Sequence, residues 1–91
     1  MGAAAELARR LESGGLTVAA LSEHPMSGVT ESRWVGPGGL VAAAEAARAA
    51  GFFFESMTCV DRLDPQGVFE LIYTFNRWDE AARFAVRVWA P

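Results

Sequence analysis

The feature that most constrains the fold of this 91-residue chain is the stretch from Val68 to Phe75, in which every second residue is large and apolar. Successive side chains of a β-strand point to opposite faces, so this alternation predicts a strand with one face in a core. The residues expected on the core face are Phe69, Leu71, Tyr73 and Phe75.

Residues 83–89 alternate in the same way and predict a second strand, with a core face formed by Phe84, Val86 and Val88. A hairpin that matches the two apolar faces and leaves residues 76–81 as the loop places Glu70 opposite Arg87, and this opposite-charge pair supports the register. The other expected pairs are Tyr73 with Phe84, Leu71 with Val86, Phe69 with Val88, and Val68 with Trp89. The outer face of the hairpin mixes apolar and charged residues, so it is neither a plain solvent face nor a full core.

Two helical periodicities lie upstream of the hairpin. Residues 3–12 carry an apolar stripe and an expected ion pair between Glu6 and Arg10, and Gly14-Gly15 follows them as a stop. The stripe consists of Ala4, Leu7, Ala8 and Leu11. Residues 40–50 follow the sequence Gly36-Pro37-Gly38-Gly39 and contain seven alanines, so this helix can lie close against a sheet. Its expected packing face is Leu40, Ala44 and Ala47.

Three more strands are expected over residues 17–21, 29–35 and 52–61. Residues 29–35 carry polar side chains on both faces, which is typical of a solvent-exposed edge strand. Turn residues occupy 22–28 and 63–67. The sequence therefore predicts one α+β domain over residues 1–91: two helices packed on a mixed or antiparallel sheet of about five strands, in the chain order α-β-β-α-β-β-β.

Composition excludes several classes of function. The net charge is −3 and every basic residue is Arg, so the basic footprint that nucleic-acid binding needs is missing. No run of apolar residues is long enough to cross a bilayer. The N-terminus lacks the pattern of a secretory signal, and the single cysteine fits a reducing compartment. These features predict a cytoplasmic chain with no membrane insertion and no nucleic-acid partner.

The residues that could carry chemistry are few. Metal sites need clustered ligands, but the single His24 and the single Cys59 lie far apart in the sequence. Cys59 is expected in a strand on one face with Phe53, Glu55 and Met57, as a packed or interface thiol with no base beside it. The glycines before the second helix lack the spacing of a phosphate loop, and Asp61 and Asp64 flank a turn. The sequence thus predicts no catalytic residue, no metal and no cofactor.

Four segments follow one another along the second half: Gly51-Phe52, Phe54 to Asp61, Phe69 to Tyr73, and Phe84 to Val88. They resemble the N-terminal domain of the C-type (thirty-kilodalton) subunit of respiratory complex I, the proton-pumping NADH:quinone oxidoreductase. The short length of the chain is similar to the small subunit of energy-converting [NiFe] hydrogenases, and a domain cut from a longer subunit is the alternative. The basic stretch of the family is replaced here by residues 78–84, so no role of that stretch is carried over.

The resemblance implies a noncatalytic assembly subunit, not an enzyme by itself, that binds no cofactor. It would dock beside the large catalytic [NiFe] hydrogenase or quinone-site subunit and the small iron–sulfur subunit, peripherally on the cytoplasmic side of the membrane. Trp and Arg dominate the energetics of interfaces, so the expected contact residues are Trp78, Trp89, Arg77 and Arg87. The alternative from the residues alone is a stand-alone homodimeric α+β domain that senses a ligand or mediates an interaction.

Overall fold

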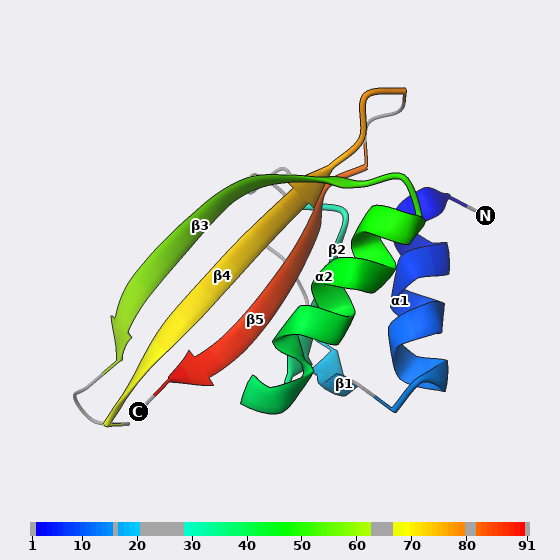
Figure 1. Cartoon of the computed structure of the whole chain (residues 1–91). Coiled ribbons are helices and arrows are strands. Elements are labelled where there is room, and N and C mark those ends of the chain that lie inside the picture. The colour runs from blue at the N-terminus through cyan, green and yellow to red at the C-terminus, as the bar shows by residue number, and fades with distance from the viewer. Residues whose placement is uncertain (1, 16, 21–28, 63–66, 80–81, 91) are drawn as a thin grey trace.

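The structure is a computed structural model that describes residues 2–15, 17–20, 29–62, 67–79 and 82–90. Three predictions concern residues that lie outside these ranges or largely outside them. They are the predictions for Leu21, for the turn 22–28 with His24, and for Asp64 in the turn 63–67. Within the described ranges, two α-helices and a mixed β-sheet form an α+β fold, which confirms the predicted class (Figure 1).

Helix α1 (Ala3–Ser13) forms where the apolar stripe predicts it. All four residues of the stripe are buried: Ala4, Leu7, Ala8 and Leu11. On the exposed side Glu6 pairs with Arg10 at 3.6 Å, as expected, and also with Arg9 at 2.5 Å. Burial of two complete leucine side chains, at roughly 2 kcal/mol each, outweighs such surface pairs and fixes this helix on the sheet.

Helix α2 (Leu40–Ala49) follows a short 3₁₀ turn, η2 (Pro37–Gly39). Ala43 and Ala47 are completely buried, whereas Leu40 and Ala44 are half-buried, so the packing face includes Ala43, which the sequence prediction omitted. The helix ends in a Schellman motif: the Phe52 N–H bonds the Ala47 carbonyl at 2.9 Å and the Gly51 N–H bonds the Arg48 carbonyl at 3.0 Å. Gly51 has the positive φ of 88° that this motif requires.

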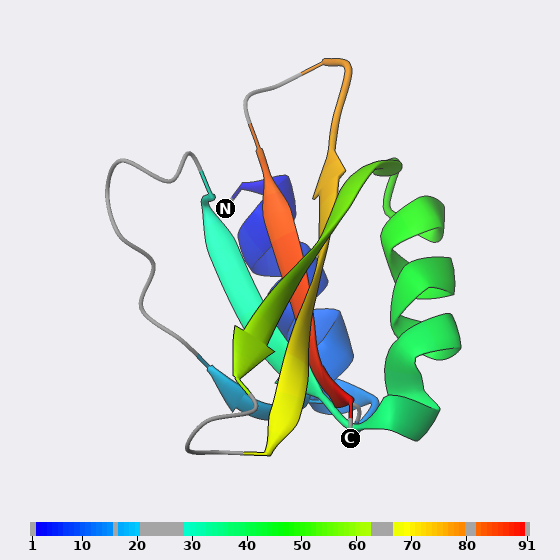
Figure 2. The same cartoon turned by 90° about the vertical axis from the view of Figure 1, so that its left-hand side faces the viewer.

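The sheet has the strand order β1-β2-β5-β4-β3. The strands are β1 (Thr17–Ala20), β2 (Glu31–Val35), β3 (Phe53–Arg62), β4 (Val68–Asn76) and β5 (Phe84–Ala90). β2 and β5 are parallel, and the other neighbours are antiparallel. Figure 2 shows β5, the last strand along the chain, between β2 and β4.

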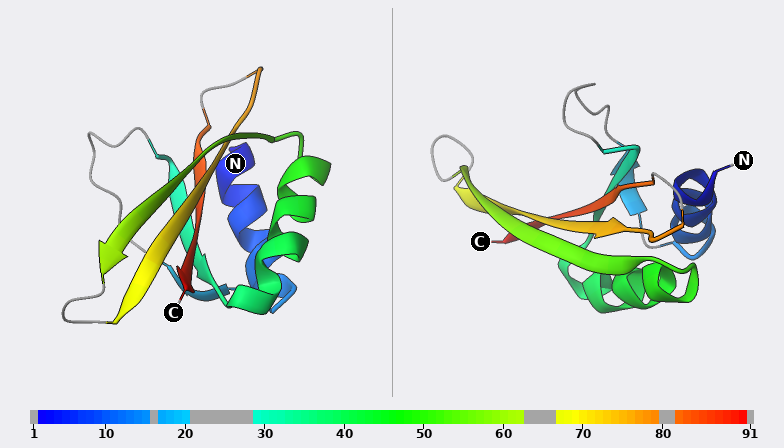
Figure 3. Two further views of the ribbon diagram at one scale, coloured as in Figure 1. Left: turned by 60° about the vertical axis from the view of Figure 1, so that its left-hand side comes forward. Right: turned by 90° about the horizontal axis from the view of Figure 1, so that it is seen from above.

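Both helices pack on one face of the sheet, α1 against β2 and α2 against β5. They share a single core with the inner side chains of β2, β4 and β5, in which Phe84 is completely buried and meets Phe52 edge-on at 6.4 Å. Seen from above, β3 and β4 extend away from the two helices (Figure 3). Neither described helix has the length and apolar character needed to cross a bilayer.

The predicted position of β2 at the sheet edge is wrong. β2 lies between β1 and β5, and Ser32 in its centre is completely buried. Its polar side chains find partners within the protein rather than in water. The side chains of Ser32 and Arg33 bond to Arg87 and Glu12, residues that are distant in the sequence.

The predicted hairpin register is wrong by two residues. Phe75 lies opposite Phe84, Tyr73 opposite Val86 and Leu71 opposite Val88, whereas Glu70 lies opposite Trp89. The loop is longer than expected, and at its end the Arg83 carbonyl accepts the Thr30 N–H at 2.8 Å, which joins residue 83 to the start of β2. A shift of two residues preserves the faces, so the predicted core residues of β5 are all buried: Phe84, Val86 and Val88.

The predicted set of residues on the same face of β3 as Cys59 is partly wrong. The register of β3 shifts between Phe54 and Ser56, and this bulge makes Glu55 an extra residue that lies opposite no residue of β4 in the register. Met57 and Cys59 share a face with Phe54, which lies opposite Phe75, rather than with Phe53 and Glu55. Cys59 is exposed on that face.

Candidate interaction surfaces

The four predicted contact residues lie in two separate places. Arg77 and Trp78 follow the end of β4, in what we call the tip cluster together with Phe53 and Asp79. Arg87 and Trp89 lie in β5 on the face away from the helices, in what we call the outer-face cluster. That cluster consists of Ser32, Trp34, Glu70, Arg87 and Trp89.

Trp78 is the most exposed large apolar residue described, with 87% of its surface accessible. Its ring nevertheless stacks on Phe53, with the ring centroids 4.3 Å apart and the planes 18° from parallel. Stacking of this kind restricts the rotamers of an exposed side chain. One face of the Trp78 ring is therefore held against the protein and most of the ring is presented to solvent.

Arg77 holds the loop that carries Trp78. Its Nε and Nη2 donate to the two carboxylate oxygens of Asp79 at 2.8 and 2.9 Å. Its Nη1 donates to the carbonyl oxygen of Ala50 at the end of α2, and the guanidinium lies 5.6 Å from the centroid of the Phe52 ring. The hydrogen bonds from Arg77 lower the pKa of the Asp79 carboxyl. Arg77 thus ties the loop to a helix end, where the exposed carbonyls favour a cation.

The bulged residue Glu55 fastens the beginning of β3 to the same region. Its carboxylate pairs with Arg83, whose Nε lies 2.9 Å from Oε1, and it accepts a hydrogen bond from Asn76 Nδ2 at 3.2 Å. The bond from Asn76, followed by that from Arg83, lowers the pKa of Glu55. Sequence alternation did not predict this contact, because it assigned Glu55 to a regular strand.

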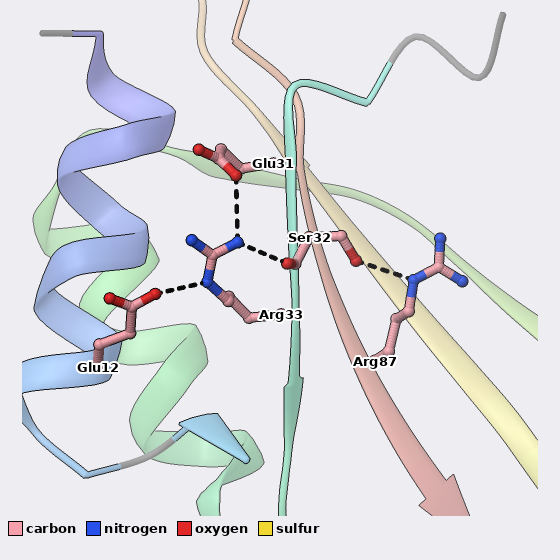
Figure 4. A network of polar contacts seen from close by, with 5 residues as sticks. All are labelled: Glu12, Glu31, Ser32, Arg33 and Arg87. Atoms are coloured by element: carbon pink, nitrogen blue, oxygen red, sulfur yellow. Dashed lines mark hydrogen bonds and ion pairs between the residues drawn. The ribbon is translucent and has the colours of Figure 1, made fainter. Parts of the chain in front are cut away.

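The outer-face cluster has an ion pair at its centre. Arg87 Nη1 lies 2.6 Å from Glu70 Oε2, and the two side chains are only 15% and 4% exposed. Arg87 Nε also donates to Ser32 Oγ at 2.8 Å (Figure 4). The sequence predicted the association of Glu70 with Arg87, but the two residues meet diagonally, because Arg87 lies opposite Ile72.

The polar contacts continue through β2 to α1. Arg33 Nε lies 2.8 Å from Glu12 Oε1, and Arg33 Nη1 lies 3.1 Å from Glu31 Oε2 and donates to the Ser32 carbonyl (Figure 4). Ser32 and Arg33 point to opposite faces of β2, so this strand links the outer-face cluster to the helix layer. The polar sequence of β2 therefore marks a junction between the two layers.

Trp89 is covered on one side by Trp34. The two rings stack with centroids 4.3 Å apart and planes 13° from parallel. Trp34 is 8% exposed and Trp89 is 37% exposed, so this pair presents less surface than Trp78. Sequence reasoning missed Trp34, although alternation within β2 places it on the same face as Ser32.

A further apolar surface lies on β3, beyond the reach of the helices. Phe54 and Met57 are 56% and 51% exposed on the helix-bearing face of the sheet, and Cys59 is exposed beside them. All six residues from Phe54 to Cys59 are exposed, so both faces of this part of β3 are open. Among the described residues, no three His, Cys, Asp or Glu side chains come together as a group that could hold a metal ion.

No protein-family model matches the chain, and no curated protein matches it. The segments that resemble the complex I subunit lie just before β3, along β3, and in β4 and β5. Membership of that family stays a prediction from these segments.

Proposed function

We propose that this chain is a noncatalytic assembly subunit of a membrane-associated oxidoreductase complex. It docks beside the large catalytic subunit of an energy-converting [NiFe] hydrogenase, or the related quinone-site subunit of an NADH:quinone oxidoreductase, and beside the small iron–sulfur subunit. It is peripheral, on the cytoplasmic side of the membrane. The sequence resemblance supplies the identity of the partners.

The observation that carries the proposal is the exposure of Trp78 in a segment, residues 77–79, that is held by contacts with Phe53 and Ala50. A tryptophan that buries its ring in a partner contributes strongly to binding, and it contributes more when its conformation is already restricted in the free protein. Phe53 restricts Trp78 by stacking, and Arg77 restricts the loop through Asp79 and the Ala50 carbonyl. The tip cluster is thus built as an anchor for another protein.

The roles of the four predicted contact residues differ in this proposal. Trp78 contacts the partner directly, and Arg77 positions it. Arg87 is mostly occupied by Glu70 and Ser32, so it supports the outer face rather than forming contacts of its own. Trp89, half-covered by Trp34, belongs to the margin of the interface.

The test is purification of a tagged chain from gently solubilised membranes of its native host, with mass spectrometry of the proteins that accompany it. We expect a [NiFe] large subunit or its quinone-site relative, together with an iron–sulfur subunit. The variant Trp78→Ala should recover these companions at least about tenfold less well, the loss typical of an anchor residue. Val41→Ala is the matched control, because Val41 is also exposed (70%) but lies on α2.

Two results would contradict parts of the proposal. Recovery of the chain without any such subunit rejects the assembly role and favours the stand-alone domain. Equal recovery with Trp78→Ala and with the wild type rejects the tip cluster as the anchor. Circular dichroism of both variants, compared with the wild type, separates a loss of binding from a loss of folding.

A further inference from the structure

The tip cluster rests on the junction between α2 and β3, residues 50–53. Arg77 Nη1 donates to the Ala50 carbonyl at the end of the helix. The same guanidinium lies 5.6 Å from the centroid of the Phe52 ring, which is itself buried in the core. Only 19% of the Arg77 side chain is exposed. The guanidinium is therefore fitted into this junction rather than extended into solvent.

Gly51 lies between these two contacts and leaves the space that the guanidinium occupies. A Cβ added at Gly51 would lie 2.7 Å from Nη1, 3.2 Å from Cζ and 3.3 Å from Nη2 of Arg77. Non-bonded carbon atoms pack at about 3.5 to 4.0 Å, so the two groups cannot both keep these positions. The three nearest atoms all belong to the end of one flexible side chain. A larger residue at position 51 therefore displaces the guanidinium rather than the backbone.

A displaced guanidinium loses its bonds to the segment that it holds. Arg77 donates to the two carboxylate oxygens of Asp79 at 2.8 and 2.9 Å, and Trp78 lies between these two residues in the chain. The bonds to Asp79 and to the Ala50 carbonyl thus restrain the backbone on both sides of the tryptophan. Without them, the stacking of Trp78 on Phe53 is no longer supported by a restrained backbone.

We propose that Gly51 is a positioning residue for the Trp78 anchor. It acts by leaving room for Arg77, which in turn restrains the segment that presents the Trp78 ring. This inference rests on the proposed function, because it takes Trp78 as the residue that contacts a partner. It adds that the affinity for the partner depends on the end of α2, since an anchor that is already ordered loses less entropy on binding.

The variant Gly51→Asn tests the space at position 51 apart from its backbone conformation. Gly51 has a φ of 88°, a region that asparagine enters more readily than most residues with a side chain. Gly15→Asn is the matched control. Gly15 follows α1 as Gly51 follows α2, with a φ of 71° and an N–H bonded to the Glu12 carbonyl at 3.1 Å. Nothing lies within 4 Å of its added Cβ.

Heteronuclear NMR relaxation of the purified chain measures the order of the Trp78 backbone and indole N–H groups without any partner. In the wild type and in Gly15→Asn the backbone order parameter of Trp78 should be about 0.85, and in Gly51→Asn it should fall below about 0.6. Arg77→Ala should lower it equally, and adding Gly51→Asn to Arg77→Ala should lower it no further. The order parameters within β4 should stay unchanged, which distinguishes a local loss of order from a general one.

Recovery of companions from native membranes is the second readout. Gly51→Asn and Arg77→Ala should each recover the foreign subunits about threefold to tenfold less well than the wild type, whereas Gly15→Asn should recover them equally well. The double variant Gly51→Asn/Arg77→Ala should be no worse than Arg77→Ala. A further loss in the double variant would show that position 51 contacts the partner directly, which overturns the positioning role.

The two readouts distinguish failure of this inference from failure of the proposed function. If Trp78 stays as ordered as in the wild type in folded Gly51→Asn or in folded Arg77→Ala, the positioning role is overturned, whatever the membranes yield. If both variants loosen Trp78 but the wild-type chain recovers no companion, the proposed function fails and the coupling between Gly51 and Trp78 stands. Circular dichroism verifies that each variant is folded.

Discussion

At the scale of single residues, the arginines hold the structure together and at the same time mark its surfaces. Arg33, Arg77 and Arg87 each bond to at least two other groups, and each has at least one partner from a distant part of the chain. A guanidinium has five donors in a rigid fork, so it can join several elements at once. An arginine that sequence reasoning assigns to an interface can therefore be an internal connector, as Arg77 is.

The pair Glu70–Arg87 gives the clearest prediction at this scale. Arg87→Met leaves the Glu70 carboxylate buried without its cationic partner, so we expect the free energy of unfolding to fall by about 3 kcal/mol or more. The double variant Glu70→Leu/Arg87→Met, which removes both charges, should be much closer to the wild type. Urea unfolding of the three proteins at neutral pH measures the difference. A double variant as unstable as the single one would show that the charge is not the cause.

At the scale of secondary-structure elements, the sequence predicts the interiors of the elements better than it predicts their ends and their pairing. Periodicity predicts the interiors of α1, β4 and β5, because their packing faces repeat within a few residues. It could not place β2 in the interior of the sheet, since the partners of Ser32 and Arg33 lie on α1 and β5. Nor could it find the hairpin register, because β5 also pairs with β2 and its first residues bond to Thr30, which is distant in the sequence.

The end of α2 carries the prediction at this scale. A Cβ atom added at Gly51 would lie 2.7 Å from Nη1 of Arg77, and the φ of 88° is itself unfavourable for alanine. Gly51→Ala should lower the free energy of unfolding by about 1 to 2 kcal/mol. Gly38→Ala is the matched control, since no atom lies within 4 Å of its added Cβ. Chemical denaturation of both variants checks the prediction, and equal stability would contradict it.

At the scale of the whole molecule, the two faces of the sheet have different characters. One face holds the shared core of both helices, and the other holds the outer-face cluster with its ion pair and its stacked tryptophans. The sequence indicated this difference correctly, because the outer positions of the last two strands mix apolar and charged residues. It could not show that the helices leave much of β3 uncovered, since that depends on the position at which α1 and α2 pack on the sheet.

Acidification should destabilise the whole domain. Glu6, Glu55 and Asp79 have lower pKa values in the folded chain than their ordinary values of 4.5 for Glu and 3.8 for Asp. Their contribution is therefore complete above those ordinary values and is lost as the pH falls through the lower folded values. The melting temperature should decrease from neutral pH to about pH 2, and less steeply in Glu55→Gln than in the wild type.

Glu45→Gln is the control for this measurement, because Glu45 is an exposed carboxyl on α2. It should follow the wild-type curve. The three groups are exposed or nearly so, and added salt should therefore reduce the difference between Glu55→Gln and the wild type. If Glu55→Gln lost its stability on acidification as steeply as the wild type, the bonds from Asn76 and Arg83 would not stabilise the fold.

The central place of β5 in the sheet has a consequence for how the protein folds while it is synthesised on the ribosome. β5 joins the β1–β2 pair to the β4–β3 pair, yet it is the last strand to be synthesised. Until residues 84–90 have left the exit tunnel, the nascent polypeptide holds two unconnected hairpins with half-built cores. Closure of this sheet therefore has to wait for β5, and the open edges of the two hairpins need protection until then.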